Sequence, residues 1–111
     1  MANAFKNNGV ATIGTSYVTV YAPSTTIPGT SGTVIGLSVA NKHTDDVLID
    51  AILSKPTGDF FIIKAAPITI GSTLLLFGGE QKMVVQPGDV VKVKSNVAAS
   101  IDVIISVLEI F

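Results

Sequence analysis

The residues best suited to chemistry are gathered in the segment NKHTDD, where the one histidine, His43, stands close to Asp45 and Asp46. A histidine beside carboxylates can help to hold a metal ion or move a proton. A catalytic metal, however, needs three convergent protein ligands, and these three residues share one short polar turn. We therefore interpret the segment as a hairpin turn, and we expect no metal, no cofactor and no catalytic residue.

Other reactive arrangements are also missing from the sequence. The chain has no cysteine, which excludes a thiolate nucleophile and a disulfide framework. No serine stands in a nucleophile-elbow setting, and Gly78-Gly79 precedes no helix that could hold a phosphate. Asp50 and Asp102 fall inside expected strands, where they should face solvent or pair with lysine. The sequence thus predicts a protein that is not an enzyme.

Charge and hydropathy exclude further classes of function. The seven basic residues are scattered lysines and the net charge is −1. Without arginine there is no bidentate fork for phosphate or guanine, so we expect no nucleic-acid partner. Only 14% of the residues are charged and the mean hydropathy is +0.61, yet no segment supplies the roughly 20 apolar residues of a bilayer span or the apolar core of a signal peptide. We expect a soluble protein that does not associate with a membrane. Its surplus apolar surface should contact another protein.

Short β-rich segments separated by turns run along the whole chain. β-branched residues dominate them, turn signals recur every 8–12 residues, and no long 3.6-residue period is present. The sequence therefore predicts an all-β fold, an antiparallel β-sandwich of about 8–9 strands that is either jelly-roll-like or immunoglobulin-like. We expect a flexible N-terminal arm over residues 1–9 and a single sandwich domain over residues 10–111. The clearest expected strands are 16–21, 33–42, 47–54, 60–65, 72–77, 82–86, 90–95 and 101–111.

Two of the expected turns have specific chemistry. Gly78-Gly79 can adopt the positive φ of a tight hairpin. Pro87-Gly88 is typical of a type II turn, which the side chain of Asp89 can then cap. In the expected strand 33–42, alternation predicts that Ile35, Leu37 and Val39 share one face.

The last expected strand, IDVIISVLEIF, has two apolar faces. Ile101, Val103, Ile105 and Val107 form one face. Ile104, Leu108 and Ile110 form the other, interrupted by Asp102 and Ser106. A sandwich strand normally has one wet face, so the second face is covered either by a loop of the same chain or by another subunit. On the second alternative the interface residues are Phe5, the one large apolar side chain of residues 2–8, together with Ile104, Leu108 and Ile110.

Several stretches carry a family resemblance over nearly the full length of the chain. They are the opening MANAF, the VAN at 39–41, the PGD turn at 87–89 and the terminal SVLEI. With them the chain resembles a group of small virion structural proteins of tailed bacteriophages that is common among marine phages. The resemblance implies a β-sandwich subunit of the particle, on the head or at the neck and tail, without enzyme activity. It supplies no functional residues.

The segment QPGDVVKV is similar to the glycine-proline turn of cupin jelly rolls. Metal-binding cupins hold the metal with histidines on their strands, and no histidine follows His43 in this chain. Any kinship with cupins would therefore be architectural and not catalytic.

Three functions are consistent with these observations. The first is a capsid decoration or cement subunit that stabilises the head, bound to the major capsid protein. The second is a subunit of a closed ring at the neck, tail or fibre attachment. The third is a glycan-binding module, which ranks last because the chain has no tryptophan and only Tyr17 and Tyr21. We expect a homo-oligomer or a partner among the phage structural proteins, assembled in the host cytoplasm and located in the virion.

Overall fold

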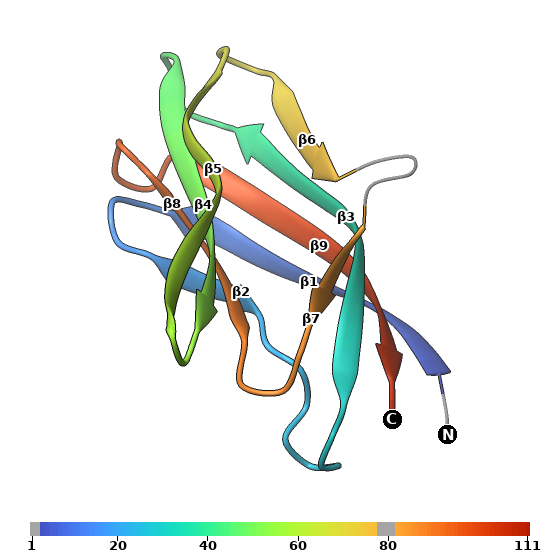
Figure 1. The fold of residues 1–111 in the computed structure, drawn as a ribbon. Coiled ribbons are helices and arrows are strands. Elements are labelled where there is room, and N and C mark those ends of the chain that lie inside the picture. Colours follow the sequence, from blue (N-terminus) through green and yellow to red (C-terminus); the bar gives the residue numbers. More distant parts are fainter. Residues whose placement is uncertain (1–2, 78–81) are drawn as a thin grey trace.

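The computed structural model describes residues 3–77 and 82–111 of the chain (Figure 1). Over these residues it contains nine β-strands and no helix. Accordingly, the described part of the chain has no helix that could cross a membrane. The strands are β1 (Asn3–Ile13), β2 (Val18–Tyr21), β3 (Ser31–Asn41), β4 (Val47–Lys55), β5 (Gly58–Ile68), β6 (Thr73–Phe77), β7 (Met83–Val85), β8 (Val90–Ser95) and β9 (Ile101–Ile110).

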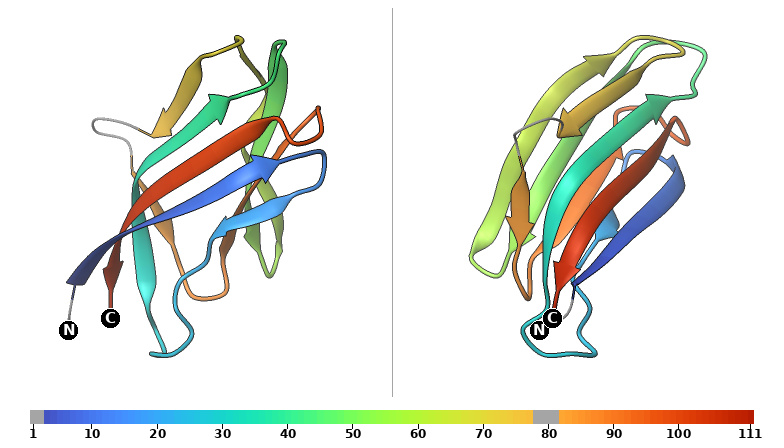
Figure 2. Two further views of the ribbon diagram at one scale, coloured as in Figure 1. Left: turned by 180° about the vertical axis from the view of Figure 1, so that it is seen from behind. Right: turned by 90° about the vertical axis from the view of Figure 1, so that its right-hand side faces the viewer.

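The strands form two antiparallel sheets that pack face to face (Figure 2). The five-stranded sheet has the order β1-β9-β3-β6, with β7 also pairing with β3, and the four-stranded sheet has the order β2-β8-β4-β5. When β7 is left out, the first strand pairs with the last and each following strand pairs with the next one in from the other end: β1 with β9, β2 with β8, β3 with β6 and β4 with β5. This arrangement is a long hairpin rolled into two sheets, as in a jelly roll. The first strands of an immunoglobulin sandwich share one sheet, whereas β1 and β2 lie in different sheets.

The core follows the two-residue period of the strands. The face of β9 that alternation assigns to the interior is buried throughout, and so are Val91 and Val93 of β8. Lys92 and Lys94 alternate with these valines and lie on the outer side of the same strand. The predicted sandwich is therefore confirmed. The buried residues of β9 are Ile101, Val103, Ile105 and Val107.

The predicted inward face of β3 is wrong at one residue. The register between β3 and β9 shifts between Val34 and Gly36, which is the signature of a β-bulge. The extra residue reverses the alternation, so that Val34 is buried and Ile35 is 37% exposed. Leu37 and Val39 are buried as expected.

The N-terminal segment differs from the flexible arm expected over residues 1–9. Residues 3–9 belong to β1, which pairs with β9 in unbroken register from Asn3 to Val10. The strand escapes a pattern search because its inward residues Lys6 and Asn8 are polar. Asn8 donates a 2.7 Å hydrogen bond from Nδ2 to the carbonyl oxygen of Val20 in the other sheet. Polar contacts at the margin of the core thus replace the apolar face of an ordinary strand.

The turn before β8 is formed as its sequence predicts. Gly88 has a φ of 90°, and the Asp89 amide donates to the Gln86 carbonyl oxygen at 3.0 Å. The Asp89 carboxylate in turn accepts the Gln86 amide at 3.0 Å and the Lys55 ammonium group at 2.8 Å. Asp89 therefore caps the turn and also ties it to the end of β4. The other predicted turn, at Gly78-Gly79, lies outside the described residues.

Candidate interaction surface

The polar turn that holds the only histidine is built from backbone caps. Asn41 Oδ1 accepts the His43 amide at 2.8 Å, and Asn41 Nδ2 donates to the Asp45 carbonyl oxygen at 3.0 Å. The carboxylate of Asp46 accepts the amide of Ile70 at 2.9 Å, which fixes this turn to the one after β5. The turn lies between β3 and β4 as predicted. Among the described residues, no three potential metal-ligating side chains come together.

The two aspartates inside strands pair with lysines, as predicted. Asp102 lies 2.7 Å from Lys42 Nζ, and its carboxylate also accepts the Thr12 amide at 2.9 Å. Asp50 lies 3.8 Å from Lys94 Nζ and accepts the Ala65 amide at 2.7 Å. Both carboxylates have structural roles, because each fixes the backbone of a neighbouring edge strand.

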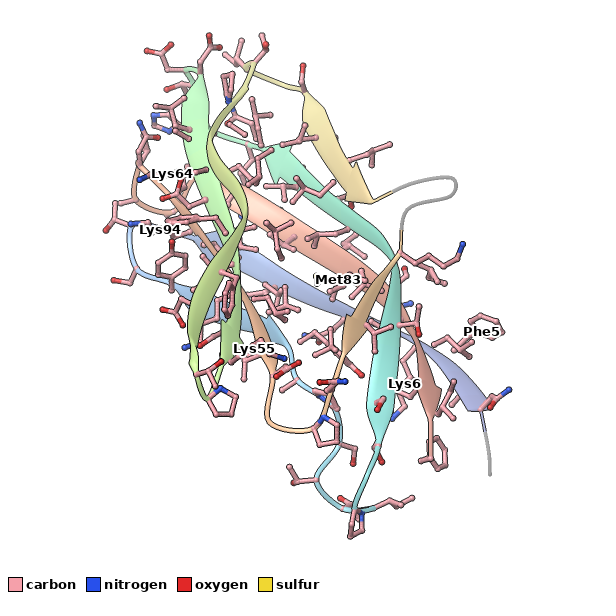
Figure 3. All side chains as sticks on the ribbon, viewed as in Figure 1. Phe5, Lys6, Lys55, Lys64, Met83 and Lys94 are labelled. Atoms are coloured by element: carbon pink, nitrogen blue, oxygen red, sulfur yellow. The ribbon has the colours of Figure 1, made fainter. Side chains whose placement is uncertain are left out.

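The outer face of the five-stranded sheet brings the predicted interface residues together. Phe5 lies directly across from Leu108, on the side of the sheet that faces away from the core. Ile104 and Ile110 continue this side along β9 and are exposed. Phe5 is 77% exposed, and its ring stands clear of the ribbon in Figure 3. All four predicted residues therefore share one solvent-facing surface, and no described loop buries Phe5, Ile104 or Ile110.

Three further apolar side chains extend this surface beyond the prediction. Leu75 on β6 and Val84 on β7 lie across from outward-facing residues of β3. Ile35 joins them because the bulge turns it outward. We call the resulting surface the outer face of the five-stranded sheet. Its apolar residues are Phe5, Ile35, Leu75, Val84, Ile104, Leu108 and Ile110.

This outer face is almost free of charge. The five strands carry only three charged residues over their described lengths, and two of them, Lys6 and Glu109, lie on the core side. The third, Asp102, lies at one end of the face and is paired with Lys42. The remaining outward positions of β1, β3 and β9 are mostly asparagine, serine, threonine and glycine. Over the described strands such a face can be removed from water without stranding an unpaired charge, and the exposed Lys82 borders it just before β7.

The outer face of the four-stranded sheet is different. It also exposes apolar side chains, among them Leu48 and Phe61. Charged residues stand between them, however, and Lys64 Nζ lies over the Phe61 ring at 5.0 Å from its centroid. Lys94 similarly lies 4.9 Å from the centroid of Tyr17, and Figure 3 marks both lysines on this sheet. The two sheets thus offer one uncharged and one charged surface.

A buried carboxylate lies at the margin of the core where β1, β2 and β9 meet. Glu109 is 2% exposed. The Tyr21 hydroxyl donates a 2.7 Å hydrogen bond to its Oε2, and Lys6 Nζ lies 2.8 Å from its Oε1. These residues border an open pocket of about 320 Å³, together with Asn8 and Ser24 among others. Sequence analysis missed this cluster, although Glu109 continues the inward alternation of β9.

The electrostatics of this cluster make it a fixed charge network. Burial alone would raise the pKa of Glu109, but the hydrogen bonds from Lys6 and Tyr21 outweigh it and hold the pKa below its ordinary value of 4.5. Burial first, and then the hydrogen bond to Glu109, raise the pKa of Tyr21. At neutral pH the carboxylate is therefore ionised and the phenol is protonated. Neither group is poised to exchange a proton near pH 7.

Acid is expected to weaken the fold through Glu109. The pKa of Glu109 is lower in the folded chain than in the unfolded one. Its contribution to stability is therefore complete above the unfolded pKa of 4.5, and it is lost as the pH falls through the pKa of the folded state. Hydrogen bonding from Lys42 lowers the pKa of Asp102 in the same direction. We expect the free energy of unfolding, measured in urea, to fall below about pH 4.5. The Glu109→Gln variant should show a shallower fall, and a slope equal to that of the unchanged protein would contradict this role.

No model of a protein family matches the chain, and no curated protein matches it.

Proposed function

We propose that the protein is a non-enzymatic structural subunit that docks on a larger protein assembly through the outer face of the five-stranded sheet. The observation that carries this proposal is the surface itself, on which seven apolar side chains share one face whose only charged strand residue lies at its end. Large exposed apolar side chains gathered on one face commonly mark protein contacts. The polar groups of this face are short and uncharged, and their desolvation costs less than that of lysine or glutamate.

The proposed assembly is the virion of a tailed phage. The resemblance of the segments MANAF, VAN, PGD and SVLEI to phage virion proteins supports this assignment. The jelly-roll order is compatible with it, because viral capsid domains, lectins and cupins all use that architecture. A fold shared so widely does not choose a function, so the assignment rests on the resemblance and on the docking face.

Within the virion, we propose that the protein decorates and cements the capsid. The described chain is a small sandwich without a helix, and its longest connection between strands is the loop over residues 22–30. Ring subunits of necks and tails are often elaborated with long loops or helices. A ring subunit at the neck, tail or fibre attachment is the alternative. A glycan-binding role is less favoured, because Tyr21, one of the two tyrosines, is buried against Glu109 and is not exposed for stacking on a sugar.

Imaging of the particle by electron cryomicroscopy tests this assignment. We expect the subunit at every equivalent position of the capsid lattice, so that its copy number follows the symmetry of the shell. If the subunit is found instead in a small closed ring at the neck or tail, the alternative of a ring subunit is correct and capsid decoration is not. Absence of the protein from the purified particle would overturn the proposal as a whole.

A further inference from the structure

β1 is a long edge strand with an open side. Among the described strands it pairs with β9 alone, at the margin of the five-stranded sheet, as Figure 2 shows. The register is unbroken from Asn3 to Val10. Half of the backbone amides and carbonyls of such a strand point away from its neighbour, and they can pair with another strand.

The other edge strands of the molecule are protected by known devices. β2 has four residues, β6 five and β7 three. β5 is long, but its pairing with β4 shifts register twice, and it carries Pro67 and an Ala65 with a φ of 52°. Short length, bulges and proline all discourage pairing with a further strand. The regular part of β1 has none of these, and its one charge, Lys6, is compensated by Glu109 at 2.8 Å.

Geometry and charge select one register for the pairing of β1 with β1 of a second copy. In an antiparallel pair of strands, two directly opposed residues point to the same face of the sheet. Odd-numbered residues of β1 face one way and even-numbered residues the other, in both copies. A two-fold symmetric pairing therefore keeps the joined sheet continuous only if odd residues oppose odd residues and even residues oppose even ones. Two registers of this kind pair the largest number of residues within the regular stretch from Asn3 to Val10. One has its two-fold axis at Lys6 and the other has it at Asn7. The register centred on Lys6 would oppose two lysines, which is unfavourable. The register centred on Asn7 opposes two asparagines instead, and it places Phe5 of each copy opposite Gly9 of the other.

The surroundings of Gly9 fit this register. A hollow of about 240 Å³ lies there, lined by Gly9, Val10, Ala11, Asp102, Val103 and Ile104. Gly9 is not required by the chain itself: a Cβ added to it would meet only the Val103 carbonyl oxygen, at 3.9 Å. An aromatic ring on a neighbouring strand can cover such a strand glycine. Phe5, 77% exposed in the single chain, is the ring that the register brings to this hollow.

We propose that two copies of the chain pair antiparallel through β1, about a two-fold axis at Asn7, with each Phe5 ring lying over Gly9 of the other copy. The pairing joins the two five-stranded sheets into one and doubles the uncharged outer face. It uses the edge of the sheet and engages Phe5 at the margin of the outer face, whereas Leu75 and Val84 lie beyond β3 and stay available for docking. It also gives β1 backbone partners on both sides.

Single-cysteine variants test the pairing and its register, because the chain has no cysteine of its own. Under mild oxidation Asn7→Cys is expected to form a covalent dimer, since the two residues oppose each other at the axis. Asn8→Cys, one residue away on the opposite side of the sheet, should form little covalent dimer. Cross-linking by Asn8→Cys but not by Asn7→Cys would overturn the register. Sedimentation that finds only monomer for the unchanged protein over the micromolar range would overturn the dimer.

Gly9→Val separates pairing from folding. The β-branched side chain suits a strand, and in the single chain its Cβ meets only the Val103 carbonyl oxygen at 3.9 Å, so the melting temperature should not fall when both proteins are measured at a concentration where they are monomeric. It fills the hollow that Phe5 of the partner occupies, twice in each symmetric dimer, so the dimer dissociation constant should rise roughly tenfold or more. A Gly9→Val protein as dimeric as the unchanged one would overturn the proposal. Leu75→Lys, far from the edge on β6, should leave the dimer intact, so that failure of the dimer and failure of the docking face are distinguishable.

Discussion

Replacing Gly32 with alanine is expected to lower the free energy of unfolding by roughly 3 kcal/mol, the upper end of the usual cost of overpacking a core position. Gly32 lies on β3 across from Glu109 of β9. The ring of Tyr21 lies directly over it: a Cβ at Gly32 would collide with the Tyr21 hydroxyl oxygen and approach the ring carbon Cε2 to 2.8 Å. An atom pair this close must separate, so the ring has to leave its position.

Displacement of the ring has a second consequence. Tyr21 donates its hydroxyl hydrogen to the buried carboxylate of Glu109 at 2.7 Å. When the ring moves, Glu109 loses this donor while it remains surrounded by protein, and an unsatisfied buried polar group costs roughly 1–3 kcal/mol. Steric conflict and lost hydrogen bonding therefore act in the same direction, although they are not additive.

Gly36→Ala is the matched control, because it makes the same change in the same strand. A Cβ at Gly36 meets no atom within 4 Å. This variant should be neutral or slightly more stable, since alanine loses less backbone entropy on folding than glycine. Urea unfolding of both variants measures the difference. If the two midpoints agree, the packing of Tyr21 on Gly32 does not contribute to stability as described.

The elements that sequence analysis predicted well are those with an uninterrupted two-residue period. β9 alternates from Ile101 to Val107 without a break, and each expected residue is buried. The turn at Pro87-Gly88 was also predictable, because proline and glycine restrict its backbone directly. In these places local preference and tertiary packing require the same conformation.

Other features were not predictable because they depend on distant partners. β1 has polar inward residues whose partners come from β9 and β2, so its own sequence does not show a strand pattern. The bulge that exposes Ile35 is a property of the pairing with β9. In β6, the run of three leucines gives no alternation, and only the register with β3 shows that Leu75 points outward. The predicted residues of β9 and Phe5 therefore lie on the outer face, and the prediction did not include Ile35, Leu75 and Val84 of the same face.

Leu75→Lys is expected to abolish docking while the fold is retained. Leu75 is 71% exposed, so the free subunit should change in stability by no more than about 0.5 kcal/mol. In the docked state the new ammonium group would be buried without a partner on an uncharged face. Burial of an unpaired charge costs roughly 3–5 kcal/mol. At about 1.4 kcal/mol for each tenfold change, the affinity for the assembly should fall roughly a hundredfold to several thousandfold.

Leu48→Lys provides the matched control on the opposite sheet. Leu48 is 43% exposed and lies between the buried Val47 and Ile49, so its side chain points away from the core. The surface around it already carries charge, because Asp50, Lys64 and Lys94 line the hollow beside it. One further lysine on this side should leave docking unchanged. The two variants thus differ in the face they alter and not in the residue exchanged.

The most direct test of the docking face is co-sedimentation of the two variants with particles that lack the native subunit. If the outer face of the five-stranded sheet is the docking surface, Leu48→Lys will sediment with the particles as the unchanged protein does, and Leu75→Lys will remain in the supernatant. If Leu75→Lys sediments normally, or if Leu48→Lys is the variant that is lost, the subunit docks through another surface and the proposed role of the outer face is contradicted.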